Sequence, residues 1–205
     1  FYPRLSGISG SRKNEESVKE RNLCVNRQLE MNVLLLGPIV AAIILGLPLI
    51  IPILYNAQFM GMLQMTQLAA VAMLFKAVYL PIEYLPLSRG DSRLFLIQES
   101  FCVILLIICE IAGYQLDGLR GVGEGIAVAY AIETLAVLAF SRAVYGYRLS
   151  ALGFRFCIFQ LLILLLVLFL VFMISYRAWL YWLIGVIIAL MSTSFSFRKI
   201  RKLVR

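Results

Sequence analysis

The sequence predicts an all-α protein that crosses a membrane several times. Hydrophobic residues make up 62% of the 205 residues, charged residues make up only 15%, and the mean hydropathy is +0.91. A soluble domain is about 45–50% apolar and about 25% charged, so one water-soluble core could not enclose this chain. The apolar residues also form long runs without the alternation of barrel strands, which favours membrane helices.

Six stretches are long enough to cross a bilayer, which takes roughly 20 apolar residues in a helix. Each must be helical, because lipid offers the backbone no hydrogen-bond partners. The predicted polytopic protein therefore has six transmembrane helices, at about Met31–Tyr55, Met62–Leu85, Leu94–Tyr114, Val122–Val144, Phe156–Ile174 and Trp179–Phe195.

The short polar loops between the stretches, and the composition of the stretches themselves, support the six predicted helices. The first is the run VLLLGPIVAAIILGLPLIIPILY, and the short loop NAQFMG separates it from the second. The loop SRGDSR separates the second from the third, and LDGLRG lies between the third and the fourth. The fifth, FCIFQLLILLLVLFLVFMI, carries no charge, and the sixth begins among tyrosines and tryptophans, which favour the membrane interface.

The cations are distributed unevenly between the spans. Alternate gaps hold sixteen lysines and arginines, whereas the other gaps hold two. Lysine and arginine collect in short cytoplasmic loops, so both the segment 1–30 and the C-terminus are predicted to face the cytoplasm. This bias and the attraction of anionic headgroups account for the net charge of +8, so no nucleic-acid partner is expected.

The expected organisation has four parts. Residues 1–30 form a cytoplasmic loop, residues 31–147 four transmembrane helices, residues 148–197 two additional peripheral helices, and residues 198–205 a basic cytoplasmic tail. The chain opens with FYPRLS, without an initiator Met or a signal-peptide pattern. We therefore expect a further helix to precede Phe1.

The composition argues against several catalytic and metal sites. The chain has no histidine, which excludes a Ser-His-Asp triad and most zinc sites. Its four cysteines form no C-x-x-C pair, and we interpret them as small apolar side chains. The run GVGEG at 121–125 lacks the preceding strand of a dinucleotide loop, so we expect it to pack helices together. No metal and no cofactor are expected, and an enzyme is disfavoured.

The second, third and fourth helices carry ionisable residues at membrane depth, whereas the apolar stretches of the fifth and sixth carry none. Such residues are costly in lipid and usually face a bundle interior or a watery cavity. Lys76 and Glu83 are seven residues apart and so share a helix face. The candidate residues of a substrate path are Lys76, Tyr79, Glu83, Glu99, Tyr130 and Glu133.

Two other interpretations of these residues stay open. Glu83 and Glu99 can instead extend to the cytoplasmic interface along their apolar stems, and Glu110 of the third predicted span can extend to the outer interface. Lys76 and Glu133 can form an ion pair that serves structure as well as transport.

Prolines interrupt the first two helices. Proline removes a helix hydrogen bond and kinks the axis, and transporters use interrupted helices near binding sites and gates. A static bend for packing is the alternative. The helix-bend candidates are Pro38, Pro48, Pro52 and Pro81.

Five segments follow one another in an order and spacing that resembles a known family: FYPRLS, VNRQLEMNVLLLGP, ILYNAQF, YLPLSRGDSRLFLIQE and LDGLRGVGEGIAVAYAIETL. They are similar to the C-terminal part of oligosaccharide flippases of the O-antigen translocase type. These flippases belong to the polysaccharide-transporter branch of the multidrug/oligosaccharidyl-lipid/polysaccharide exporter superfamily. The similarity covers about residues 1–150.

The resemblance implies a two-lobed helical bundle, with this chain as its C-terminal lobe, around a cavity that opens alternately to either side. The implied substrate is a glycan on undecaprenyl pyrophosphate, such as an O-antigen or capsule repeat unit. It would move from the cytoplasmic to the periplasmic leaflet of the bacterial inner membrane. The expected partners are membrane lipid, the lipid-linked oligosaccharide and assembly proteins such as a glycan polymerase. Coupling to H⁺ or Na⁺ stays open.

For such a substrate, depth and charge alone make Lys76 the expected phosphate contact, since it is the only deep cation and a buried charge must be paired. Glu99 and Glu133 are expected to couple ions or to bond sugar hydroxyls. A drug/cation antiporter of the same superfamily is the first alternative, because its cavity would be acidic and aromatic. A membrane enzyme of glycan assembly is a weaker alternative, because the outer loops are only a few residues long.

Overall fold

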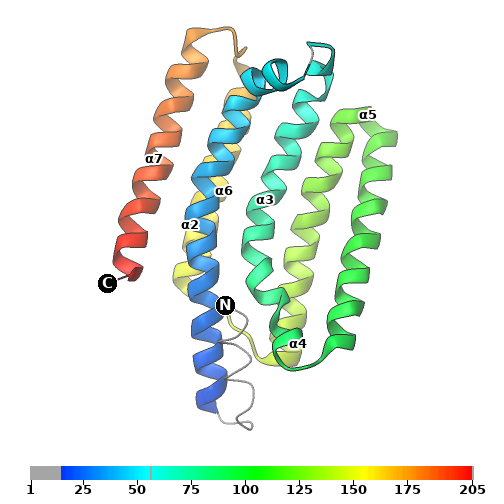
Figure 1. Ribbon diagram of the computed structural model, residues 1–205, viewed down its shortest axis with the longest axis vertical. Helices are drawn as coiled ribbons and strands as arrows, with labels where there is room; N and C mark the ends of the chain where they lie inside the picture. The colour runs from blue at the N-terminus through cyan, green and yellow to red at the C-terminus, as the bar shows by residue number, and fades with distance from the viewer. Residues whose placement is uncertain (1–14, 56, 205) are drawn as a thin grey trace.

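The computed structural model describes residues 15–55 and 57–204, and over these residues it contains helices and no strand (Figure 1). This confirms the all-α prediction. The elements, in chain order, are α2 (Glu15–Leu54), η1 (Ala57–Met62), α3 (Leu63–Glu83), α4 (Leu85–Ser88), α5 (Ser92–Tyr145), α6 (Ala151–Met173) and α7 (Trp179–Val204).

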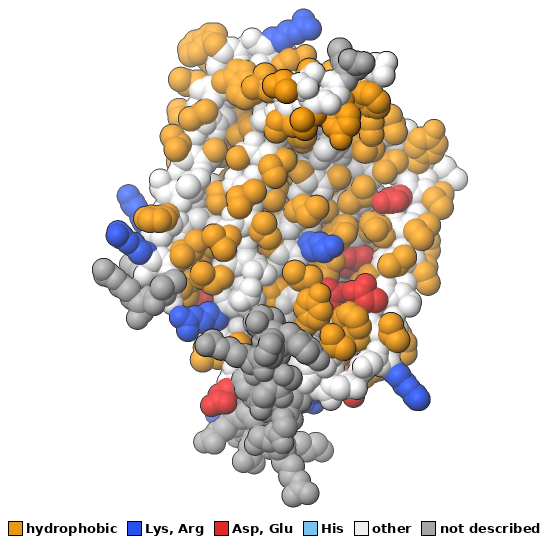
Figure 2. All heavy atoms as spheres, viewed as in Figure 1, with side chains coloured by type: hydrophobic (Ala, Val, Ile, Leu, Met, Phe, Trp, Pro, Cys, Tyr) orange, Lys and Arg blue, Asp and Glu red, His pale blue; other side chains and the backbone are white. Residues whose placement is uncertain are grey.

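The described part of the chain has the build of a multi-pass membrane protein. Five of its helical segments are long and apolar enough to cross a membrane. Large apolar side chains cover much of the outer surface (Figure 2). Leu162, Phe169 and Leu190, for example, are 60–62% exposed. Such side chains would be costly to leave in water, and a hydrocarbon surrounding accounts for them.

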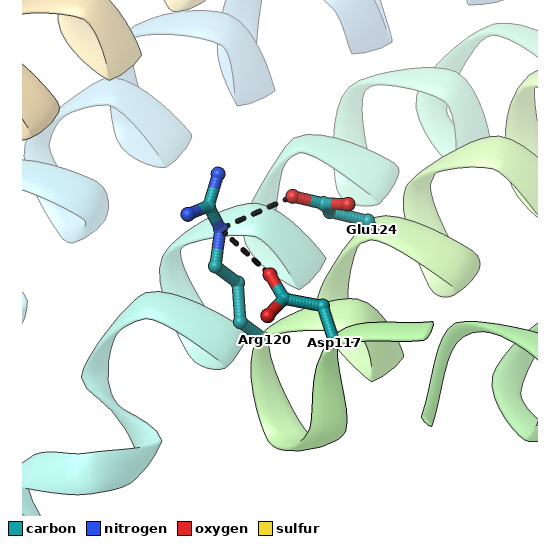
Figure 3. Close-up of polar contacts among 3 residues, drawn as sticks. All are labelled: Asp117, Arg120 and Glu124. Atoms are coloured by element: carbon teal, nitrogen blue, oxygen red, sulfur yellow. Dashed lines mark hydrogen bonds and ion pairs between the residues drawn. The ribbon is translucent and has the colours of Figure 1, made fainter. Parts of the chain in front are cut away.

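The predicted third and fourth spans are joined in the structure as the single 54-residue helix α5. The chain reverses within it at Asp117 and Gly118, and Gly118 has a φ of +57°, a left-handed conformation that glycine adopts without strain. Two antiparallel limbs result (Figure 1). At the turn, Arg120 lies 3.5 Å from Asp117 and 3.2 Å from Glu124, forming two exposed ion pairs (Figure 3).

The glycine run that follows this turn packs the helices closely, as the sequence predicted. A Cβ atom on Gly121 would collide with the backbone of Gly113 in the other limb. A Cβ atom on Gly123 would lie 2.5 Å from the carbonyl oxygen of Met65 in α3. The glycine run therefore packs closely against the first limb of α5 through one side and against α3 through another.

The helices form two groups, and the packing of α2 against α3 joins them. In one group, α3 packs against both α2 and α5. In the other, α6 and α7 pack against α2 and against each other, and α7 lies at the edge of the bundle (Figure 1). Leu29 and Ile44 of α2, Ile82 of α3 and Leu164 of α6 are fully buried between them.

The four helix-bend candidates all lie inside helices, three in α2 and one in α3. Along its described length, α2 continues as one helix through its three prolines. In α3, the helix ends at Glu83, two residues after Pro81, and the short helix α4 follows. A functional bend at any of these prolines stays a prediction.

A side chain of a neighbouring helix replaces one backbone hydrogen bond that a proline removes. Pro48 has no N–H, so the carbonyl of Ile44 loses its usual partner four residues later. The Gln67 side chain of α3 donates its Nε2 to this carbonyl at 3.1 Å. Neighbouring helices satisfy freed backbone groups in this way when lipid cannot.

The helix α2 begins at Glu15, whereas the sequence predicted a loop up to residue 30. The segment is polar, but it buries one face, and Val25 and Leu29 are 0% exposed. At about 1.5 Å per residue, α2 is about 60 Å long, roughly twice the hydrocarbon thickness. The rest of the predicted loop, with the FYPRLS segment, lies outside the described residues.

The bundle has one end rich in cations, here called the basic end. It comprises the start of α2, the linkers 89–91 and 146–150, and the last turns of α7. The Arg27 guanidinium of α2 donates to the Leu203 carbonyl of α7 at 2.7 Å and so connects two of these parts. The turn of α5 and the linker 174–178 lie at the opposite end, with Arg120 and Arg177 (Figure 1). The segregation of charge predicted from the sequence is therefore preserved in space.

Candidate functional site

The six candidate path residues all line one pocket, of about 280 Å³, between α3 and the two limbs of α5. Figure 2 shows acidic and basic side chains gathered within an otherwise hydrophobic face in this region. From α3 come Lys76, Tyr79 and Glu83, from the first limb of α5 comes Glu99, and from the second limb come Tyr130 and Glu133.

Helical spacing explains the contribution of α3. Residues three, four and seven apart lie on one helix face, and Lys76, Tyr79 and Glu83 have this spacing. Tyr79 and Glu83 are only 5% and 4% exposed, whereas Lys76 is exposed at the rim of the pocket. The burial of Glu83 argues against the interpretation in which its carboxyl group extends to the interface.

The reversal of α5 explains the rest of the site. Glu99 precedes the turn, and Tyr130 and Glu133 follow it, so the two limbs bring together residues that are distant in sequence. Glu133 is 2% exposed, and Glu99 is half-buried. The pocket thus exists only when the hairpin of α5 packs against α3.

Two tyrosine rings connect the helices across the pocket. The rings of Tyr79 and Tyr130 are stacked, with centroids 6.1 Å apart and planes inclined by 24°. The Nζ atom of Lys76 lies 5.8 Å from the centroid of the Tyr130 ring, a cation–π distance. The Lys76–Glu133 ion pair is not formed: within the described ranges, the ion pairs are those of Arg120.

The site is more acidic than basic. Three carboxyl groups line it, and Lys76 is the one basic residue among its described lining. Glu83, Glu99 and Glu133 reach this small pocket from α3 and from the two limbs of α5. Carboxyl groups that share one site repel each other when all of them are ionised. The arrangement can therefore hold a proton or a cation, and it can accept hydrogen bonds from hydroxyl groups.

Cys102 also lines this pocket and is 7% exposed, although it was not among the residues predicted from the sequence. Its position three residues after Glu99 places it on the same helix face, so periodicity could have found it. Glu110 does not line the pocket. The Thr134 hydroxyl lies 2.8 Å from the Tyr130 carbonyl of its own helix and 3.4 Å from the Phe75 carbonyl of α3, so it also links the two helices.

A second buried polar cluster lies outside the pocket, between α6 and α7. Gln160 of α6 donates to the Ser196 hydroxyl at 2.9 Å and accepts from the Ser192 hydroxyl at 2.9 Å. Gly37 of α2 leaves the space that the Gln160 side chain occupies. Because both ends of the amide are satisfied within the protein, this cluster is a structural contact between helices.

In the ranges 15–55 and 57–204, no group of three or more Cys, Asp or Glu side chains is arranged to hold a metal ion. Comparisons with protein-family models, curated proteins and solved structures find no match to this chain.

Proposed function

We propose that this chain is the C-terminal lobe of a flippase that moves a lipid-linked oligosaccharide across the bacterial inner membrane by alternating access. The observation that supports the proposal is one polar pocket that all six candidate residues line, in a bundle whose outer surface is largely apolar. In this proposal both limbs of α5 cross the membrane, which makes six spans, and the basic end faces the cytoplasm.

The chemistry of the pocket suits the headgroup of such a substrate. Polar and charged groups cannot cross hydrocarbon without replacement partners. The stacked rings of Tyr79 and Tyr130 offer an aromatic surface to a sugar, and the carboxyl groups accept from its hydroxyls. Lys76, exposed at the rim, is the donor for the pyrophosphate.

The buried carboxyl groups provide the energetic coupling in this proposal. Glu83, Glu99 and Glu133 surround one pocket, and a proton bound there would offset their mutual repulsion. Release of the ion on the other side of the membrane would then favour the opposite orientation of the two lobes.

A drug/cation antiporter of the same superfamily is the second candidate. The excess of carboxyl groups over the single lysine favours an organic cation, and the two tyrosine rings would stabilise it through cation–π contacts. This function uses the same residues, so transport assays have to separate the two.

The test is reconstitution of the full-length protein into liposomes. We expect a fluorescent undecaprenyl-pyrophosphate oligosaccharide to become accessible on both leaflets, and a cationic dye in matched liposomes to be retained. Efflux of the dye without movement of the lipid-linked sugar would replace the flippase with the antiporter. Movement of neither substrate would contradict both.

A further inference from the structure

A second pocket lies at the basic end and shares no residue with the candidate site. It has a volume of about 670 Å³, within the range of ligand-binding pockets. Its lining comes from the last turns of α5 and from the linker to α6, and consists of Leu138, Ala139, Arg142, Tyr147, Arg148 and Leu149.

Two arginines of this pocket have no counterion among the residues that the structure describes. Arg142 and Arg148 are both exposed, and within the described part of the chain neither side chain forms an ion pair or a hydrogen bond. No carboxylate is among the described residues that line the pocket. Two guanidinium groups repel each other unless an anion lies between them, and their planar donors match phosphate oxygens.

The wall that carries Arg148 is fixed by hydrogen bonds. Asn26 of α2 donates to the Arg148 carbonyl at 2.9 Å, and its Oδ1 accepts from the Tyr147 hydroxyl at 2.8 Å and from the Ser150 N–H at 2.9 Å. Tyr147 is 1% exposed, and burial raises the pKa of its phenol, so it stays a donor at neutral pH. The linker is therefore a preformed part of the pocket.

The pocket is also amphipathic along the direction of the spans. Arg142 is in the last turn of α5, at the end of a membrane-spanning segment, and Leu138 lies one turn further into that segment. Lysines and arginines at such positions attract anionic lipids. A phospholipid has the same order of groups, with its phosphate at the surface and its acyl chains deeper.

We propose that this pocket binds the phosphate headgroup of an anionic phospholipid, with Arg142 and Arg148 as donors and with Leu138 and Leu149 against the first part of the acyl chains. A zwitterionic lipid would also bring its ammonium group near the two arginines, so the site prefers phosphatidylglycerol to phosphatidylcholine. This site is separate from the transported substrate and does not depend on the proposed function.

Native mass spectrometry of the full chain in detergent micelles, titrated with phosphatidylglycerol or phosphatidylcholine, tests the proposal. We expect the double variant Arg142→Gln/Arg148→Gln to weaken phosphatidylglycerol binding about tenfold or more, the loss expected for charge-assisted hydrogen bonds. Arg155→Gln is the matched control. It removes an exposed arginine from the same end without touching the pocket, and it should bind as the unaltered protein does.

A third variant keeps the charges and removes the space. Ala139→Trp, at an exposed position, fills the pocket and should also abolish the preference for phosphatidylglycerol. Unchanged binding by this variant or by the double variant would overturn the proposal. Equal losses in Arg155→Gln would assign the preference to the general charge of the basic end. Inorganic phosphate binding as tightly as phosphatidylglycerol would replace the lipid site with a site for free anions.

Discussion

At the residue scale, the ionisable groups of the candidate pocket differ in exposure. Glu83 and Glu133 are 4% and 2% exposed, so any change in them alters the fold as well as the pocket. Lys76 is exposed, and its ammonium group lies against the ring of Tyr130. Lys76 is therefore the residue that separates function from stability most cleanly.

If the protein is the proposed flippase, we expect Lys76→Ala in the full-length protein to lower surface glycan about tenfold or more, because the proposed charge-assisted contact to phosphate would be lost. Exposed substitutions usually change stability by only about 0.5 kcal/mol, so the amount of protein in the membrane should stay constant. Lectin staining of intact cells and immunoblots of membranes measure the two quantities. Lys76→Arg should preserve export. Normal glycan in Lys76→Ala would remove Lys76 from the mechanism.

A second residue-scale prediction concerns Gln67. Gln67→Leu should lower the free energy of unfolding by about 1–3 kcal/mol, because the buried Ile44 carbonyl loses its donor. Denaturant titration in detergent measures this change, and Gln64→Leu, at an exposed position of the same helix, is the control. Adding Pro48→Ala restores a backbone N–H near Ile44 and should reduce the cost. If Gln67→Leu lowers the free energy of unfolding equally with and without Pro48→Ala, the Gln67 side chain does not stand in for the backbone donor that Pro48 lacks.

Periodicity explains how much of the pocket could be predicted from the sequence. The shared face of Lys76, Tyr79 and Glu83 follows from local helix geometry. The stacking of Tyr79 on Tyr130 could not be predicted, because it depends on how α5 folds back on α3. For the same reason the sequence could not decide between an ion pair of Lys76 with Glu133 and other contacts: in the structure the ring of Tyr130, on the same limb as Glu133, lies beside the ammonium group.

At the element scale, hydropathy predicts the apolar helices but not the helical structure of polar segments that pack against protein. The helices α3 and α7 begin at Leu63 and Trp179, next to the predicted starts at Met62 and Trp179. The start of α2 was missed because residues 15–30 form an amphipathic helix that buries Val25 and Leu29 against protein, not lipid. A window that measures only apolar length cannot detect such a segment.

The glycine run of α5 gives a prediction about an element. Gly123→Ala should lower the free energy of unfolding by about 1–3 kcal/mol, because the added Cβ would lie 2.5 Å from the Met65 carbonyl oxygen and would push α5 away from α3. Gly61→Ala is the matched control, since nothing lies within 4 Å of a Cβ there. Equal stability of the two variants in a detergent unfolding assay would show that this helix contact tolerates separation.

At the scale of the whole molecule, the cations define two ends of the bundle, and only the positive-inside rule assigns them to sides of the membrane. Linker residue Arg148 lies at the basic end, whereas Arg177 and the turn of α5, with the 87% exposed Leu116, lie at the other. If both limbs of α5 cross the membrane, positions 116 and 177 must face the same compartment, opposite to position 148.

Single cysteines at these positions, in a protein whose four native cysteines are replaced by serine or alanine, would establish the topology. We expect a membrane-impermeant maleimide to label Leu116→Cys and Arg177→Cys in intact spheroplasts, and to label Arg148→Cys only after permeabilisation, because the positive-inside rule predicts that the basic end faces the cytoplasm. The opposite pattern would invert the protein in the membrane. Labelling of positions 116 and 148 from the same side would contradict six spans, since the second limb of α5 would then not cross the bilayer.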